Sequence, residues 1–478
     1  MEAVMDIRNK TAYLFIITLV ASLGGFLFGF DMAVVSGILP LLQKQFSLSA
    51  FQEGWFVSSA LVGCIIGVAI SGELSDRLGR KKPLLLAALL FLLSAIGCAF
   101  LPSLPGIIAA RIMGGIGIGL ASNVVPLYIS EIAPARIRGR LVTYYQFALT
   151  LGILVAYLTN SALLNYALAH TGDASSWLHT IMVSEVWRGM FGIGVIPAVL
   201  FMVGLFMIPE SPRWLIQQHR EQEATTILNR INNHIEAQAS LQQGKQSQRD
   251  KKISYRSLLA PQWRKALIIG ILLPLFSQFS GINAIIYYGP SILNNAGISL
   301  SNSLLSQIIF GGANMLFTLI AIWKVDSLGR RPLYLVGTAG ATISLLLTGI
   351  CFYAGATTGW ALLFCVLAFL ASFAFSIGPL KFVVAAEIFP GNIRGRAMAI
   401  SIMVMWIADT IVGQLTPILL KSIGSAYTFW LFALFCLIAF ITVYKLLPET
   451  KGKSLEQIEK DWKDQAKDED LFVTPVGH

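Results

Sequence analysis

Two residues of opposite charge stand inside long apolar stretches, where a charge is costly. Asp31 ends the segment GGFLFGFD, and Arg111 lies near the start of another apolar stretch. A carboxylate in hydrocarbon is a candidate functional group by default. An opposite charge nearby favours the ionised carboxylate, whereas desolvation favours the neutral acid. Moving Arg111 away would let Asp31 take up a proton, so the pair could act as a switch. The alternative is a permanent ion pair that only joins two segments.

The elements that must position this pair are membrane-spanning helices. Hydrophobic residues make up 55% of the chain and charged residues 13%, roughly half the charge of an average soluble domain. Stretches of about 20 apolar residues cross a hydrocarbon core of about 30 Å as a helix. The twelve predicted spans cover residues 12–39, 51–73, 83–103, 105–131, 139–164, 188–208, 265–292, 303–324, 332–355, 358–388, 397–420 and 426–447.

The basic residues lie in alternate loops, so the net charge of +10 reports topology and gives no reason to expect a nucleic-acid partner. Lys and Arg follow spans 2, 4, 8 and 10, whereas the opposite loops carry few. The positive-inside rule makes the basic loops cytoplasmic, and an even number of spans returns the C-terminus to that side. We therefore expect a multi-pass protein of the cell (inner or plasma) membrane with both termini cytoplasmic. Counting residues along spans 1 and 4 then places Asp31 and Arg111 at similar depth in the outer part of the membrane.

An internal repeat divides the chain into two six-span halves. EIAPARIRGR from Glu131 and EIFPGNIRGR from Glu387 match at seven of ten positions across an offset of 256 residues. A second pair sets Asp76 against Asp326, and a third sets PESPR against PETKGK. Such repeats put a transported substrate between the halves, near the membrane midplane. We expect an N-terminal half (1–208), a cytoplasmic linker with short amphipathic helices (209–264), a C-terminal half (265–447) and a cytoplasmic tail (448–478).

Two short amphipathic elements are expected outside the spans. In the linker, Ile227, Leu228, Ile231 and Ile235 fall on one helical face, which predicts a helix lying under the bundle. After span 12, Ser454 and Gln457 have the spacing of a capping box, and an apolar stripe follows them. One short helix is expected there.

These motifs together resemble the sugar porter family of the major facilitator superfamily, over essentially the whole chain. They comprise GELSDRLGRK, Arg111 followed by GGIGIG, PLYISEIAPARIRGR, PESPRWL, SQFSGINAIIYYGP, EIFPGNIRG and PETKGKSLEQIE. The resemblance implies an all-α fold of twelve transmembrane helices and transport by alternating access. Proton-coupled members have Asp at the position of Asp31 and facilitative animal members have Asn, so Asp31 favours proton symport.

Acids and arginines of these motifs cluster at predicted helix ends where the halves meet. Carboxylate–guanidinium pairs there can break as a set when the halves rock apart, which indicates an inner gate. The alternative is that the arginines only fix topology. The expected gate residues are Asp76, Arg77, Arg80, Glu131, Arg138, Glu210, Arg213, Asp326, Arg330, Glu387 and Arg394.

The resemblance also implies a sugar site of amides beside aromatic rings, because hydroxyls exchange water for amides while C–H faces pack on rings. The expected binding residues are Gln146, Gln278, Asn283, Asn314 and Trp406, with Phe28, Tyr287, Phe382 and Asp409 beside them. On an ideal helix Gln278 and Asn283 point about 140° apart. The helix must therefore bend or break, and Gly281 permits it.

Several positions depart from the family pattern. Ser277 replaces the first of two paired glutamines, Phe382 replaces a tryptophan, and Ile153 and Met405 stand where relatives have glutamines. Lys381 and Asp409 are charges where none is expected, and an Asn is typical at 409. They could form a pair, or Asp409 could face the cavity as a sugar ligand or a second protonatable site.

The sequence thus favours a proton-coupled monosaccharide symporter, with a hexose or pentose and a proton as its substrates. A uniporter in which Asp31 stays paired is the nearest alternative, and a transporter-like sugar sensor is a more distant one. We expect no enzymatic activity, no cofactor and no metal, because we find no metal cluster, nucleophile–base arrangement or phosphate loop in the sequence. The other expected partner is membrane lipid, with function as a monomer.

Overall fold

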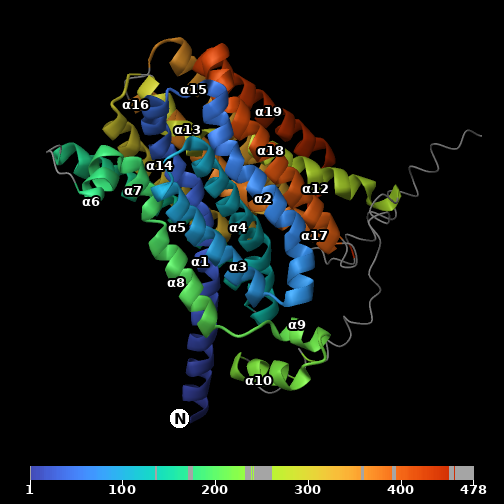
Figure 1. Ribbon diagram of the computed structural model, residues 1–478. Helices are drawn as coiled ribbons and strands as arrows, with labels where there is room; N and C mark the ends of the chain where they lie inside the picture. Colours follow the sequence, from blue (N-terminus) through green and yellow to red (C-terminus); the bar gives the residue numbers. More distant parts are fainter. Residues whose placement is uncertain are drawn as a thin grey trace, which may run out of the picture. The chain divides into compact units, whose positions relative to one another are not determined.

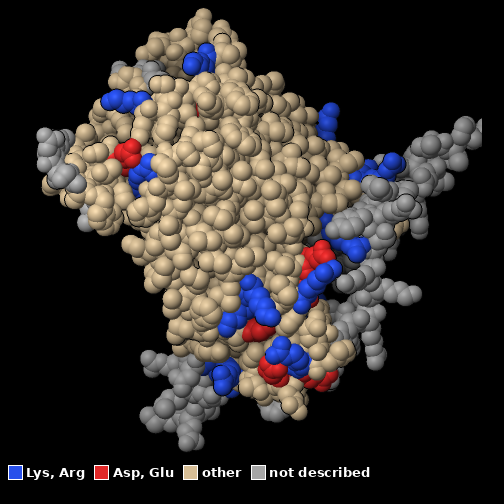
Figure 2. All heavy atoms as spheres, viewed as in Figure 1, with Lys and Arg blue, Asp and Glu red and all other residues tan. Residues whose placement is uncertain are grey.

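The computed structural model of the chain describes residues 2–134, 137–170, 176–231, 238, 241, 261–295, 297–356, 360–389, 394–451 and 457. Within these residues all regular structure is helical (Figure 1). In the described part of the chain, twelve helical segments are long and apolar enough to cross a membrane, and each overlaps one of the predicted spans. Figure 2 shows large stretches of surface without charged side chains, and several described Lys, Arg, Asp and Glu side chains lie close together near the lower end of the view. The predicted all-α membrane fold is confirmed.

The first six spans are built from seven helices, because the sixth span is interrupted. The helices are α1 (Glu2–Phe46), α2 (Ala50–Leu78), α3 (Lys81–Phe100), α4 (Leu104–Ile132), α5 (Arg138–Ala169), α7 (Val186–Gly192) and α8 (Val195–Met207). A short helix α6 (Trp177–His179) and a π-helical turn η1 (Thr180–Ser184) precede α7. Local signals set the boundaries: Ser49 and Gln52 form a capping box at the start of α2, which satisfies free backbone donors there.

The second six spans contain two interruptions. The helices are α12 (Pro261–Phe279), α13 (Ile282–Asn295), α14 (Leu300–Leu328), α15 (Arg330–Tyr353), α16 (Trp360–Ser372), α17 (Gly378–Ile388), α18 (Arg394–Ser422) and α19 (Gly424–Leu446). Span 7 divides into α12 and α13, and a π-helical turn η3 (Phe373–Ile377) joins α16 to α17 in span 10.

The break in span 7 lies where the sequence predicts it. Gly281 adopts φ +82°, a left-handed conformation that favours glycine. A Cβ at this position would also lie 2.4 Å from the Phe432 ring. Both observations explain why α12 ends and α13 begins around this glycine.

Glycines bring α2 and α4 into close contact, and this contact positions Arg111. A Cβ on Gly115 would lie 1.9 Å from the Ala60 carbonyl oxygen, and one on Gly119 would lie 2.3 Å from that of Cys64. Small residues let helix backbones approach closely in a membrane. The glycine run after Arg111 therefore packs α4 directly on α2.

The chain divides into two compact units, and the boundaries between them fall in the linker, within α13 and within α14. Unit 1 comprises Met1–Asp250 with Ile286–Met315, and unit 2 comprises Lys251–Ile285 with Leu316–His478. In unit 1, the Tyr157 hydroxyl donates to the Ile286 carbonyl at 3.4 Å, and the Ser301 hydroxyl donates to the Asn165 side chain at 3.0 Å. Most of α13 and the first part of α14 thus pack with the first six spans.

Two short helices of the linker, α9 (Pro212–Gln217) and α10 (Glu221–Ile231), lie beyond the ends of α3 and α8 (Figure 1). Trp214, Leu215 and Ile216 of α9 bury against Ala224 of α10. Leu228 and Ile231 of α10 are buried, and both belong to the helical face expected to be apolar. Ile235 lies outside the described residues, and so does the predicted tail helix apart from Gln457.

Candidate transport site

Asp31 on α1 and Arg111 on α4 lie together inside unit 1. Arg111 Nη1 is 3.9 Å from Asp31 Oδ2, with 1% of the Arg111 side chain and 18% of the Asp31 side chain exposed. This distance is longer than the 2.7–2.9 Å or so of a charge-assisted hydrogen bond. The contact is therefore an electrostatic attraction between two separated groups.

The Arg111 guanidinium also contacts a backbone carbonyl and two aromatic rings. Arg111 Nε donates to the Phe56 carbonyl at 3.1 Å, and its guanidinium carbon lies 5.1 Å from the Phe56 ring centre and 5.7 Å from that of Phe191. Aromatic faces attract a cation at such distances. Among the described residues, Arg111 Nη1, Arg111 Nη2 and Asp31 Oδ2 have no hydrogen-bond partner. Arg111 is thus held mainly by α2 and α7, and its contact with Asp31 is weak.

In unit 2, three predicted site residues form one hydrogen-bonded chain. Asn283 Nδ2 donates to Gln278 Oε1 at 2.8 Å and to Asp409 Oδ1 at 2.7 Å. Gln278 is on α12, Asn283 on α13 and Asp409 on α18. The break at Gly281 lets Gln278 and Asn283 meet, although they would point apart on a continuous helix.

Lys381 on α17 also contacts this part of unit 2. Its Nζ donates to the Ser277 hydroxyl at 2.9 Å, and the Asp409 charge attracts it. The two unexpected charges therefore contact different neighbours in the same region, one through Ser277 and one through Asn283. Trp406 is buried one turn before Asp409 on α18.

The remaining predicted sugar residues belong mostly to unit 1. Tyr287 on α13 is buried, and its hydroxyl lies 3.6 Å from the Met32 sulfur. Phe28 on α1, Gln146 on α5 and Asn314 on α14 are half-buried. The side chain of Phe382 lies outside the described part of the chain. Phe28, Gln146, Tyr287 and Asn314 thus belong to unit 1, and Gln278, Asn283, Trp406 and Asp409 belong to unit 2.

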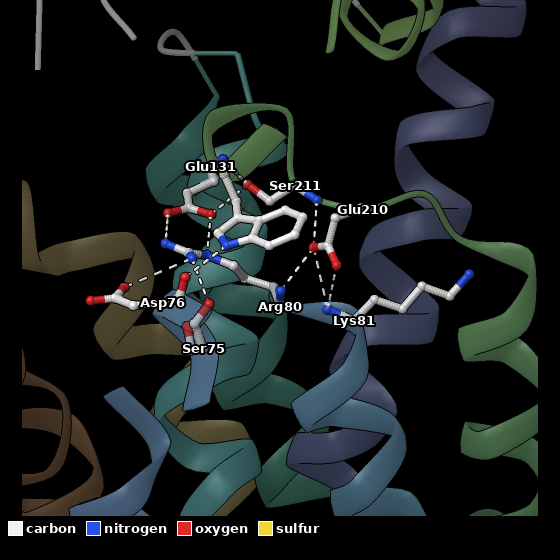
Figure 3. Close-up of polar contacts among 8 residues, drawn as sticks. Ser75, Asp76, Arg80, Lys81, Glu131, Glu210 and Ser211 are labelled. Carbon is white, nitrogen blue, oxygen red and sulfur yellow. Dashed lines mark hydrogen bonds and ion pairs between the residues drawn. The ribbon is translucent and has the colours of Figure 1, made fainter. Parts of the chain in front are cut away.

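A cluster of three charged residues and one serine in unit 1, here called the N-cluster, comprises Arg80, Glu131, Glu210 and Ser211 (Figure 3). Arg80 Nε and Nη2 donate to the two Glu131 oxygens at 2.8 and 2.7 Å. The Ser211 hydroxyl donates to Glu131 at 2.5 Å. A bidentate guanidinium–carboxylate pair combines strength with fixed geometry, so the N-cluster fixes the start of α3 against the end of α4.

Glu210 closes the N-cluster by accepting backbone N–H groups. It accepts from Arg80 at 2.8 Å, from Lys81 at 3.2 Å and from Ser211 at 2.8 Å (Figure 3). A carboxylate at a helix N-terminus satisfies free donors and complements the helix dipole. Gly79 has φ +88°, and a Cβ there would lie 2.3 Å from Glu210, so the turn requires glycine.

Unit 2 repeats this arrangement in the C-cluster, which comprises Arg330, Glu387, Glu449 and Thr450. Arg330 Nη2 donates to Glu387 at 2.8 Å, and the Thr450 hydroxyl donates to Glu387 at 2.6 Å. Glu449 accepts the backbone N–H groups of Arg330 at 3.0 Å and of Arg331 at 3.1 Å. Burial tends to raise the pKa of Glu449, but backbone N–H donation outweighs it and lowers that pKa below its usual value.

Three other predicted gate residues are described, and all three are exposed. Asp76 is exposed and 3.9 Å from Arg80; Arg77 pairs with Glu73 at 2.5 Å with most of both side chains exposed. Arg213 is exposed. The side chains of Arg138, Asp326 and Arg394 lie outside the described residues.

Sequence reasoning did not single out Ser211, Glu449 or Thr450 as site residues. The signal was present, because Ser211 follows Glu210 in PESPR and Thr450 follows Glu449 in PETKGK. Aligning the two halves through all three repeated motifs would have placed Glu210 opposite Glu449 and Ser211 opposite Thr450.

Twelve spans with a duplicated ion-pair cluster and buried charges beside amides define a membrane transporter of the major facilitator type. A sequence profile described as "Sugar (and other) transporter" matches residues 17–462. The chain therefore belongs to the sugar transporter family, which confirms the predicted family and the prediction that it is a transporter and not an enzyme.

Individual relatives agree with this membership. The chain is 41% identical over 455 residues to the arabinose-proton symporter of Bacillus subtilis (strain 168), covering 95% of this chain and 96% of the relative. It is 39% identical over 497 residues to the D-xylose-proton symporter of Escherichia coli (strain K12), covering 97% and 98%. An inward-open structure of the xylose transporter from E. coli matches with a TM-score of 0.80 and 38% identity, covering 94% of this chain and all of that one (100%).

Proposed function

We propose that this protein is a proton-coupled monosaccharide symporter that works by alternating access. Its family membership and its similarity to arabinose-proton and xylose-proton symporters support this function. The observation that carries the coupling is the Asp31–Arg111 pair within the spans, in which a buried Arg111 lies 3.9 Å from a partly buried Asp31.

The loose pair explains how proton binding could be linked to a conformational change. While Arg111 stays close, its charge favours ionised Asp31; when α1 and α4 move apart, the desolvated carboxylate is favoured in its neutral form. Because Arg111 is anchored to Phe56 on α2, a displacement of α1 would leave the guanidinium in place. Protonation of Asp31 would thus accompany movement of α1.

The driving force is sufficient for uphill transport. A tenfold proton gradient supplies about 1.4 kcal/mol, and 100 mV of membrane potential adds about 2.3 kcal/mol per charge. Together these sustain an accumulation of several-hundred-fold with one proton per sugar, by the same conversion.

The sugar would bind between amides and aromatic rings. We assign its contacts to Phe28, Gln146, Gln278, Asn283, Tyr287, Asn314, Phe382, Trp406 and Asp409. Two observations support this assignment. Asn283 donates to both Gln278 and Asp409. The buried Trp406 lies one helical turn before Asp409 on α18. Hydroxyls gain neutral partners there, and a C–H face gains a ring.

The N-cluster and the C-cluster would form the inner gate, one in each unit. Both join a loop after a span to the end of another helix through a bidentate pair. Such pairs break and re-form as a set when helices rearrange. Asp76, 3.9 Å from Arg80, lies at the edge of the N-cluster, and the proposed gate keeps the other predicted residues, Arg77, Arg138, Arg213, Asp326 and Arg394.

We place the protein in the cell membrane with the basic loops and both termini in the cytoplasm, surrounded by lipid. Both repeat halves occur in one chain, which supports transport by a monomer.

The test is uptake into liposomes with an imposed inward proton gradient, assayed with labelled glucose, galactose, xylose and arabinose. We expect uphill accumulation of at least one sugar, loss of that accumulation in Asp31→Asn, and survival of downhill exchange in the variant. Equal uptake with and without the gradient would instead make the protein a uniporter.

A further inference from the structure

Unit 2 buries two opposite charges that the transport cycle above does not use as charges. Lys381 is 8% exposed and Asp409 is 2% exposed. A buried charge is costly unless it is paired and hydrogen-bonded. Here the Asp409 charge attracts Lys381, and each group has a hydrogen bond to a different residue of the sugar-binding region.

Asp409 determines which end of the Asn283 amide is available. The two N–H groups of Asn283 Nδ2 match its two acceptors, Gln278 Oε1 and Asp409 Oδ1. An ionised carboxylate can only accept hydrogen bonds, so Asp409 requires the NH₂ end of Asn283 to face it. Asn283 is left with its carbonyl oxygen, an acceptor. Gln278 Oε1 accepts from Asn283 and keeps one further lone pair, while the Gln278 NH₂ group supplies the donors of this pair of amides.

Lys381 completes the arrangement on the other side. Its Nζ donates to the Ser277 hydroxyl at 2.9 Å, and Ser277 directly precedes Gln278. A short Ser side chain leaves room for a long Lys side chain from α17. The ammonium compensates the Asp409 charge, which allows Asp409 to stay ionised beside Asn283.

We propose that Asp409 and Lys381 form a compensated charge pair that sets the hydrogen-bonding polarity of the sugar subsite. Besides the sugar contact assigned to it above, Asp409 positions Asn283 through Oδ1. Lys381 positions Ser277 and is the counter-charge of Asp409. The inference rests on the proposed sugar transport and adds a rule for selectivity. One sugar hydroxyl must donate to Asn283 Oδ1, and a neighbouring hydroxyl must accept from the Gln278 NH₂ group.

The test uses monodeoxy and monofluoro analogues of the best-transported sugar, as competitors of labelled-sugar exchange in liposomes. Fluorine cannot donate a hydrogen bond. At the ring position read by Asn283, the wild type should therefore reject the fluoro analogue as strongly as the deoxy analogue. In Asp409→Asn the Asn283 amide is free to turn, so the inhibition constant of the fluoro analogue relative to the parent sugar should fall about fivefold, one hydrogen bond's worth.

A matched control separates this effect from a general disturbance. Glu73→Gln makes the same acid-to-amide change at an exposed site, and it should keep the wild-type ratio at every ring position. An unchanged ratio in Asp409→Asn would overturn the proposal. If the wild type exchanges no monosaccharide at all, the proposed transport function fails, which is a different outcome.

Stability provides a second readout that does not need transport. Lys381→Met and Asp409→Asn each leave one buried charge uncompensated, so each should lower the melting temperature of the purified protein. The double variant removes both charges and should recover at least half of the larger loss. Losses that simply add in the double variant would contradict a compensated pair.

Discussion

The N-cluster and the C-cluster share their bonds and differ in burial. Each pairs an arginine with a glutamate, adds one hydroxyl, and places a second glutamate on the N–H groups that open a helix. The Glu131 side chain is 3% exposed, whereas that of Glu387 is 25% exposed. The repeated motif therefore determines the geometry, while the local surroundings determine how strongly each pair contributes to stability.

The same two units differ completely inside the membrane. Unit 1 has Asp31 facing Arg111 across 3.9 Å without a hydrogen bond at Asp31 Oδ2, among the described residues. In unit 2, Asp409 accepts a 2.7 Å hydrogen bond from Asn283. The loosely held carboxylate suits a change of protonation, and the tightly held one suits orientation of an amide. The repeated ion-pair clusters thus suit a gate, whereas the two carboxylates that differ, Asp31 and Asp409, suit proton coupling and sugar binding.

The largest expected effect on stability comes from breaking the more buried cluster. Arg80→Ala leaves Glu131 buried without a cation, so the free energy of unfolding should fall by about 3–5 kcal/mol. Arg330→Ala should lower it by only about 1–2 kcal/mol, because water reaches Glu387. Chemical unfolding in detergent measures both. Equal losses would show that burial does not distinguish the clusters.

Glu449→Gln should give an intermediate, pH-dependent effect. Backbone donors, outweighing burial, lower the pKa of Glu449 from its ordinary 4.5. Its ionised form therefore stabilises the fold above pH 4.5, and this contribution disappears as the pH falls through the lowered value. The free energy of unfolding of the wild type should exceed that of Glu449→Gln by about 1 kcal/mol at pH 7. Melting curves from pH 7 to pH 3.5 should show the difference shrinking; a constant difference would refute the assignment.

The smallest effect is expected at Arg77, a predicted gate residue that the structure places on the surface. Its side chain is 76% exposed and pairs with Glu73, and exposed pairs contribute little. Arg77→Ala should change the free energy of unfolding by at most about 0.5 kcal/mol. A loss approaching that of Arg80→Ala would mean that the N-cluster extends to Arg77.

The spans and the glycine break could be predicted from the sequence because each depends on local chemistry. Apolar length predicts a helix in the membrane, and the need for Gln278 and Asn283 to meet indicates a break near Gly281. The amphipathic face around Leu228 follows from helical periodicity in the same way.

Partner choice could not be predicted so well, because it depends on which helices pack together. The motif places Arg77 and Arg80 three residues apart, yet Arg77 faces outward to Glu73 and Arg80 faces Glu131 on α4. The sequence left open whether Lys381 and Asp409 pair, and it could not show that Lys381 donates to Ser277 and that Asp409 accepts from Asn283.

The most direct test of the account is sugar-driven proton uptake. Adding sugar outside unbuffered liposomes that contain the wild type should make the external solution more alkaline, with about one proton taken up per sugar molecule. Asp409→Asn should keep this stoichiometry at a higher sugar concentration, and Asp31→Asn should take up sugar with no proton. Proton uptake that survives in Asp31→Asn, or disappears in Asp409→Asn while sugar still enters, would contradict the assignment of coupling to Asp31.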